Sequence, residues 1–168
     1  MGDVVLLAAQ DRARWDKTLL ARGFVHLRGA MAAPELTALH LEAGIAGVHA
    51  SAPSFAQTDW SALVHYYELL IELKPTPVMK LNAAIAQACA DGPGAGLVQL
   101  DELAGNTRLS RCAHYHAARA DLLLKLERRD KARDALLQAL ECPLNGAERD
   151  YLMRKLPACS AAARLAHS

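Results

Sequence analysis

The sequence is poor in aromatic residues: two Trp, four Tyr and two Phe make up 5% of its 168 residues. β-Strands favour aromatic and β-branched residues, whereas the Ala and Leu that dominate the 52% hydrophobic fraction lose little entropy in a helix. The composition therefore predicts an all-α protein. At this length the chain fits one domain or one short run of repeats, with enough residues to bury a core.

Positive and negative charges nearly balance, because the sequence has 19 Lys and Arg and 18 Asp and Glu, which gives a formal net charge of +1. Proteins that bind duplex nucleic acid usually concentrate basic residues on one face, so direct nucleic-acid binding is disfavoured. No apolar run approaches the ~20 residues of a membrane-spanning helix. The N-terminus carries Asp3 where a secretory signal has a basic residue. We therefore expect a cytoplasmic protein without a membrane partner.

Patterns typical of enzymes and metal sites are also missing. His114 and His116 lie about 200° apart around a helix, so they do not share a face for a metal ion. No Gly-rich phosphate loop follows a strand, and no nucleophile motif is present. We predict no enzyme activity, no cofactor and no metal. Four widely spaced cysteines are interpreted as thiols in a reducing compartment; they are Cys89, Cys112, Cys142 and Cys159.

Capping and turn residues divide the chain into helices. The apolar spacing predicts a first helix over 10–28 with Asp11 as its cap, and Pro34 and Glu35 predict the start of a second. Gly44 and Gly47 on that second helix would let a neighbouring helix approach closely. Further helices are expected at about 59–74, 76–90, 95–103, 110–127, 130–141 and 147–156.

Between Trp60 and Cys142 the helices alternate with short turns at roughly the period of tetratricopeptide-type repeats. The stretch 120–142 fits best, with Ala120 and Leu123 at buried positions, although Glu127 stands where the inter-helix turn usually has Gly. We predict antiparallel helix pairs stacked as a short tetratricopeptide-like right-handed α-solenoid. Residues 1–52 would form an N-terminal helical pair packing on the stack, and 53–168 the repeats with a C-terminal capping helix.

Candidate protein-binding residues are large aromatic and polar side chains. The two tryptophans either anchor the packing of their helices or line a groove for a partner peptide, and their apolar stripes favour packing. Tyr66 points away from the apolar stripe of its helix, which suits a contact surface. The remaining polar candidates are expected along the inner groove of the stack. The full set is Trp15, Trp60, Tyr66, Asn82, Tyr115 and Arg119.

Several local strings, in one consistent order along nearly the whole chain, resemble a known family. They include QDRARWD at 10–16, AGVHA at 46–50, TDW at 58–60, PTPV at 75–78, DGP at 91–93 and YHAARADLL at 115–123. Together they resemble the C-terminal extension of a group of bacterial extracytoplasmic-function RNA polymerase sigma factors. The sequence departs from the common pattern at Ala83, where an Arg often follows the Asn.

The resemblance implies a setting for the predicted helix stack. In that family two promoter-reading helical domains precede this region, and neither has a counterpart here. The resemblance thus implies a regulatory module that modulates transcription initiation through protein contacts with sigma domains, RNA polymerase or a signalling partner, by helix-in-groove or peptide-in-groove recognition. The alternative is a small-molecule- or metal-binding helical sensor domain. The oligomeric state stays open, with a homodimer among the options.

Overall fold

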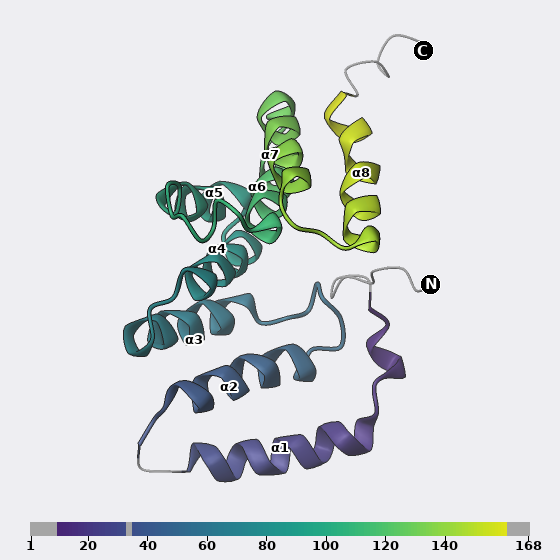
Figure 1. Ribbon diagram of the computed structural model, residues 1–168. Helices are drawn as coiled ribbons and strands as arrows, with labels where there is room; N and C mark the ends of the chain where they lie inside the picture. Colours follow the sequence, from purple (N-terminus) through teal and green to yellow (C-terminus); the bar gives the residue numbers. More distant parts are fainter. Residues whose placement is uncertain (1–9, 33–34, 161–168) are drawn as a thin grey trace. The chain divides into compact units, whose positions relative to one another are not determined.

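The computed structural model describes residues 10–32 and 35–160, and every regular element in these ranges is a helix (Figure 1). The predicted all-α class is confirmed. No helix in the described ranges has the length and apolarity needed to cross a membrane. Contacts divide the chain into two compact units. Among the described residues, the first unit comprises those up to Ala86 and the second unit those from Gln87 onward. A compact unit is not by itself an independently folding domain, and the domain boundary expected at 52–53 stays a prediction.

Over residues 10–32 a short 3-10 helix and a separate α-helix replace the predicted single helix over 10–28, and that prediction is wrong at its start. A 3-10 helix, η2, spans Arg12–Arg14, and α1 spans Lys17–Met31. Asp11 accepts a hydrogen bond from the Ala13 amide, and Asp16 accepts two more from the first turn of α1. The first amides of a helix have no partner inside the helix, and each carboxylate accepts hydrogen bonds from such amides. Asp11 therefore caps η2 and Asp16 caps α1, so the chain begins a helix twice.

The next helix, α2, spans Ala38–Ser51, and the Thr37 amide before it donates to His40 Nδ1 at 3.0 Å. Pro34 lies outside the described residues, but residues 35–37 are not helical, so the start predicted at Pro34 and Glu35 is too early. α2 packs on α1 and on α3, which spans Trp60–Leu73. A Cβ added at Gly44 would stand 2.6 Å from the Tyr66 ring of α3. The expected close approach of a neighbouring helix at Gly44 is therefore confirmed.

Local signals determine both ends of α3 and the start of α4. Asp59 accepts from the Ala62 amide at 2.9 Å at the start of α3, and the helix ends at Leu73 before Lys74 and Pro75, as predicted. α4 spans Pro77–Ala90, and the Thr76 hydroxyl accepts from the Met79 amide at 3.2 Å.

The second unit holds α5 (Pro93–Glu102), α6 (Ala113–Lys125), α7 (Arg129–Glu141) and α8 (Gly146–Ser160). Consecutive helices pack on one another, α5 on α6, α6 on α7 and α7 on α8. The core between α6 and α7 consists of Ala and Leu side chains without solvent exposure or nearly so, as the repeat predicted: Ala120, Leu123, Ala132, Leu136 and Ala139.

The turn from α6 to α7 has the backbone that a glycine would favour. Glu127 has a φ of 58°, in the left-handed region. The Arg128 amide donates to the Leu123 carbonyl at 2.9 Å, and the Glu127 amide donates to the Leu124 carbonyl at 3.0 Å. These two bonds form a Schellman motif, which closes the C-terminus of α6. At the position where the repeat usually has Gly, Glu127 thus adopts the left-handed backbone conformation that favours Gly.

The last helix, α8, begins with a reciprocal cap, because the Asn145 amide donates to Glu148 and the Glu148 amide donates to Asn145, both at 2.9 Å. It runs on to Ser160, past the end expected at 156, with Pro157 in its last turns. Pro157 removes the amide that would bond the Met153 carbonyl, yet the helix continues for three residues beyond it.

Candidate functional site

An apolar groove of about 440 Å³ lies between α1 and α2. Its walls carry leucines and a phenylalanine, its floor carries glycine and alanine, and two histidines lie at its edges. Neither Lys, Arg, Asp nor Glu is among its lining residues. The lining includes Leu19, Gly23 and Leu27 of α1. From α2 it includes Leu39, Ala43, Ala46, Gly47 and Ala50.

The walls of this groove are unusually exposed for apolar side chains. Leu39 is 72% exposed and Leu19 is 61% exposed, and α1 has no fully buried residue. Scattered exposed leucines are ordinary on a protein surface, but these belong to one concave, uncharged surface. Figure 1 shows α1 and α2 running side by side in opposite directions. Such a surface indicates a place where another apolar surface binds.

Small residues give the groove its depth. A Cβ added at Gly47 would stand 2.7 Å from Leu27 Cδ2, so α1 approaches α2 at a point where α2 has no side chain. This confirms the expectation for Gly47. Ala43, Ala46 and Ala50 continue the floor along α2.

A buried arginine connects the segment before α1 to the end of α2. One terminal nitrogen of Arg12 donates to the carbonyls of His49 at 2.8 Å and Ala52 at 2.9 Å, and the other donates to the Thr58 hydroxyl at 3.3 Å. Arg12 is only 9% exposed. A cation at the C-terminal end of α2 also complements the helix dipole. Sequence reasoning missed this residue, because no local pattern distinguishes it from Arg14.

Both predicted tryptophans lie in the first unit, Trp15 beside this arginine and Trp60 beside His49. The Arg12 guanidinium lies 5.3 Å from the centre of the Trp15 ring, and the Trp60 ring makes edge contacts with Phe55 at 4.8 Å and His49 at 5.7 Å. Burial, and secondarily the charge of Arg12, lowers the pKa of His49. Trp15 and Trp60 are half-buried in these contacts, and binding of a partner by either stays a prediction.

Tyr66 and Asn82 are also half-buried, and neither lines the groove between α1 and α2. Tyr66 lies with its ring against Gly44, in the contact between α2 and α3. Asn82 lies on α4. Their contribution to partner binding likewise stays a prediction.

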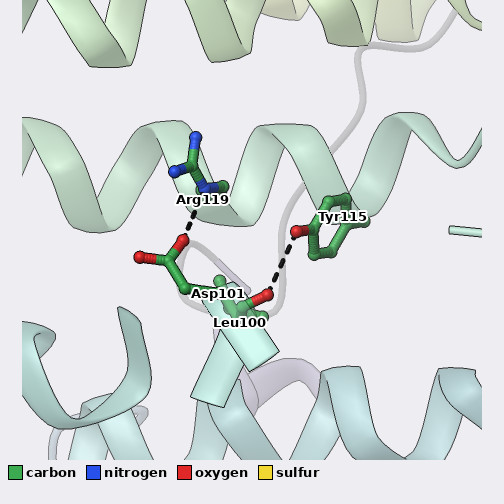
Figure 2. Close-up of polar contacts among 4 residues, drawn as sticks. All are labelled: Leu100, Asp101, Tyr115 and Arg119. Atoms are coloured by element: carbon green, nitrogen blue, oxygen red, sulfur yellow. Dashed lines mark hydrogen bonds and ion pairs between the residues drawn. The ribbon is translucent and has the colours of Figure 1, made fainter. Parts of the chain in front are cut away.

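Tyr115 and Arg119 join α6 to the end of α5 (Figure 2). The Tyr115 hydroxyl donates to the Leu100 carbonyl at 3.0 Å, and Arg119 Nε donates to the Asp101 carboxylate at 2.9 Å. Tyr115 is 5% exposed, and burial raises the pKa of its hydroxyl. The sequence predicted both residues as polar candidates along the inner groove, but their partners on α5 come from a contact that spacing does not reveal.

The described residues form an all-α protein in which α1 to α3 and α5 to α8 pack on their neighbours in chain order, with an exposed apolar groove between α1 and α2. No group of three or more His, Cys, Asp or Glu side chains within the described ranges is placed to hold a metal ion.

Comparison with known proteins adds two relatives. The chain is 35% identical, over 155 residues, to an uncharacterized protein of Rhizobium meliloti (strain 1021); the match covers 92% of this chain and 36% of that protein. It is 35% identical over 71 residues to a serine/threonine-protein phosphatase T of Trypanosoma brucei brucei, a match that covers 42% of this chain and 15% of the phosphatase. The chain therefore spans about a third of the first relative and less of the second. No family model and no solved structure matches the chain.

Proposed function

We propose that this chain is a protein-binding helical module and that the groove between α1 and α2 binds an amphipathic helix of its partner. The observation that carries the proposal is the exposed, uncharged lining of that groove, above all Leu39 at 72% exposure. Leaving such a surface in water costs about 25 cal/mol for each Å² of apolar area, and a partner's apolar face recovers this free energy.

The shape and charge of the groove specify the chemistry of the partner. Two antiparallel helices present a trough into which the ridge of a third helix fits, with apolar residues at i, i+3, i+4 and i+7. α1 carries three exposed basic residues, Lys17, Arg22 and Arg28, and no acidic residue, whereas α2 carries the exposed Glu42. We therefore expect a partner helix with acidic residues on the side of its apolar stripe that lies along α1, because they would pair with these basic side chains.

The biological setting that we propose is regulation of an extracytoplasmic-function-type sigma factor. The resemblance of the ordered strings to the C-terminal extension of these factors supports this setting. It is compatible with the relative from Rhizobium meliloti, in which the matching region is about a third of a longer protein. Sigma domains, core RNA polymerase or a signalling protein would then supply the helix. Nothing in this proposal requires enzyme activity or contact of this chain with DNA.

A labelled synthetic helix tests the groove. The peptide carries Leu at i, i+3, i+4 and i+7 with Glu beside this stripe; one control peptide has the same residues in scrambled order, and another has Lys for Glu. Fluorescence anisotropy would show saturable binding of the acidic helix and weaker binding of both controls. Leu39→Asp should reduce the affinity at least tenfold, since it puts a charge into an apolar contact. Leu73→Asp, on an exposed residue of α3 outside the groove, should not.

Equal binding of the scrambled peptide, or an equal loss in Leu73→Asp, would refute the groove as a helix-binding site. A dimer in sedimentation that Leu39→Asp dissociates would identify a second copy as the occupant and overturn the proposal of a different partner. The setting is tested separately, by binding of the chain to purified sigma domains and core polymerase. Absence of that binding with retained peptide binding would refute only the sigma-factor setting.

A further inference from the structure

A second cavity, polar and of about 470 Å³, lies in the other unit, where the loop before α6 faces the end of α7. Its volume is in the range of small-molecule sites. The loop contributes Ser110 and Arg111, α6 contributes His116, and the end of α7 contributes Gln138 and Glu141. Cys142 and Pro143 complete the lining. The cavity is far more polar than the groove between α1 and α2.

The lining carries two opposite charges, on Arg111 and Glu141, and both side chains are exposed to water. Arg111 and Glu141 form no ion pair with one another, and neither forms one with any other residue of the described ranges. Both nevertheless lie close enough to Cys142 to act on its thiol. Burial raises the pKa of Cys142, Cys112 and Glu141 raise it further and Arg111 lowers it. The raised pKa favours the neutral thiol, so the charges of the lining are the cation of Arg111 and the anion of Glu141.

A buried histidine in the same wall also has an unused polar atom. His116 is 8% exposed, and its Nε2 lies 2.9 Å from the Ser110 carbonyl, to which it must donate. In the neutral ring Nδ1 is then an acceptor, and this atom is buried without a donor. Buried polar atoms without a partner are rare in native proteins, and they mark sites that are completed by a water or a ligand.

We propose that this cavity binds a small zwitterion of the α-amino acid class, independently of the groove between α1 and α2. The ligand carboxylate would pair with the Arg111 guanidinium, and the ligand ammonium with the Glu141 carboxylate. The amide of Gln138 and the hydroxyl of Ser110 are the remaining polar groups, and Pro143 and Cys142 offer apolar contact to the ligand's side chain. A pure anion would leave Glu141 facing it, and a pure cation would leave Arg111 facing it, so one ligand bearing both charges fits best.

A ligand bound in this cavity would make the chain a small-molecule-binding helical sensor, the alternative function that the sequence left open. The cavity is formed by both helices of the best-matching repeat, α6 and α7, together with the loop that leads into α6. A ligand bound there would connect the start of α6 with the end of α7, which are far apart in sequence. Binding would therefore stabilise this helix pair in proportion to ligand concentration.

The test is an NMR titration of the full chain with pools of the proteinogenic amino acids, followed by single compounds from the pool that binds. Propionate and methylamine, each with only one of the two charges, are the control ligands. We expect saturable shifts at the amides of Arg111, His116 and Gln138 with amino acids and none with the control ligands. Arg111→Gln and Glu141→Gln should each weaken binding roughly 10- to 100-fold, the effect of losing one charged hydrogen bond. Arg108→Gln and Glu102→Gln, exposed and outside the cavity, are the matched control variants.

Thermal melts of all four variants verify that they fold, since exposed substitutions usually change stability by under ~0.5 kcal/mol. Absence of saturable shifts with every pool would overturn the proposal. So would equal binding of propionate, which would identify an anion site, or an equal loss in Arg108→Gln. Because these shifts are read in the unit that holds α6 and α7, the outcome does not depend on whether the groove between α1 and α2 binds a helix.

Discussion

The Tyr66 ring of α3 covers Gly44 of α2 so closely that a Cβ at Gly44 would stand 2.6 Å from Cε1 and 2.9 Å from Cζ. Gly44→Ala therefore forces the ring or the helix to move. We expect it to lower the free energy of unfolding by roughly 1–3 kcal/mol, the cost of overpacking.

The control for that prediction is Gly29→Ala on α1, where an added Cβ meets nothing within 4 Å. It should raise stability by about 0.5–1 kcal/mol, because Ala is the better helix former. Urea denaturation followed by circular dichroism measures both. A Gly44→Ala protein as stable as the Gly29→Ala protein would contradict the close contact.

Glu127 supplies a stabilising substitution. Its φ of 58° costs a residue with a side chain roughly 1–2 kcal/mol, and glycine avoids that cost. Glu127→Gly should therefore raise the free energy of unfolding by about 1 kcal/mol. Lys125→Gly, two residues earlier inside α6, should lower it by about the same amount, since glycine is a poor helix former. Thermal or urea melts that gave both substitutions the same sign would contradict the left-handed turn.

Arg12 is expected to be important for the stability of the first unit. Arg12→Ala removes three hydrogen bonds from a charged donor and leaves the His49 and Ala52 carbonyls without this partner. A loss of about 2–4 kcal/mol is expected. Arg14→Ala, an exposed residue of the same short helix, should change stability by under ~0.5 kcal/mol. Equal losses in the two variants would argue against the buried position of Arg12.

His49 predicts a pH dependence of known sign. Its pKa in the folded protein is below the ordinary value of 6.5, so between the two pKa values the unfolded chain binds more protons. Stability contributed by His49 is thus complete above 6.5 and decreases as the pH falls through the folded-state pKa. Urea melts between about pH 5 and 8 should show a steeper loss on acidification for the natural chain than for His49→Gln. Parallel curves would contradict the lowered pKa.

The two contacts of Figure 2 should differ in their effect on stability because they differ in burial. Tyr115→Phe leaves the Leu100 carbonyl without the buried hydroxyl and should cost about 1–2 kcal/mol. Arg119→Gln breaks an ion pair whose side chains are 28% and 50% exposed and should cost less than about 1 kcal/mol. Chemical denaturation of the two variants gives the comparison. A larger loss for Arg119→Gln would show that the ion pair is the stronger link.

Local chemistry explains why much of the helical order was predictable. Asp59, Pro75 and the Ala120–Leu123 pair act through their immediate neighbours or through the helical period, and each behaves as the sequence predicts. The start of α1 shows the limit of such rules. Asp11 and Asp16 are equally good caps, and sequence alone gives no reason for the chain to use both.

The sites depend on contacts between residues that are distant in sequence, and these were not predictable. Arg12 contacts positions 49, 52 and 58, and nothing nearby in the sequence indicates it. Apolar periodicity predicts that Leu39 lies on the apolar side of a helix, but not whether another helix covers that side. In the structure Leu39 is uncovered. Exposure of apolar side chains is the property that suggests binding, and it depends on how the helices pack together.

The floor of the groove between α1 and α2 has a consequence for how such a site would change over generations. At Gly47 the place of a side chain is taken by Leu27, whose Cδ2 lies 2.7 Å from where a Cβ would stand, so any larger residue there displaces this lining residue of the groove. The function would be lost by adding a methyl group, while every charged and polar side chain of the chain stayed the same. A comparison of sequences that follows only reactive or charged residues would therefore overlook the loss. Glycine and alanine at positions 43, 46, 47 and 50 are the residues to follow in related chains.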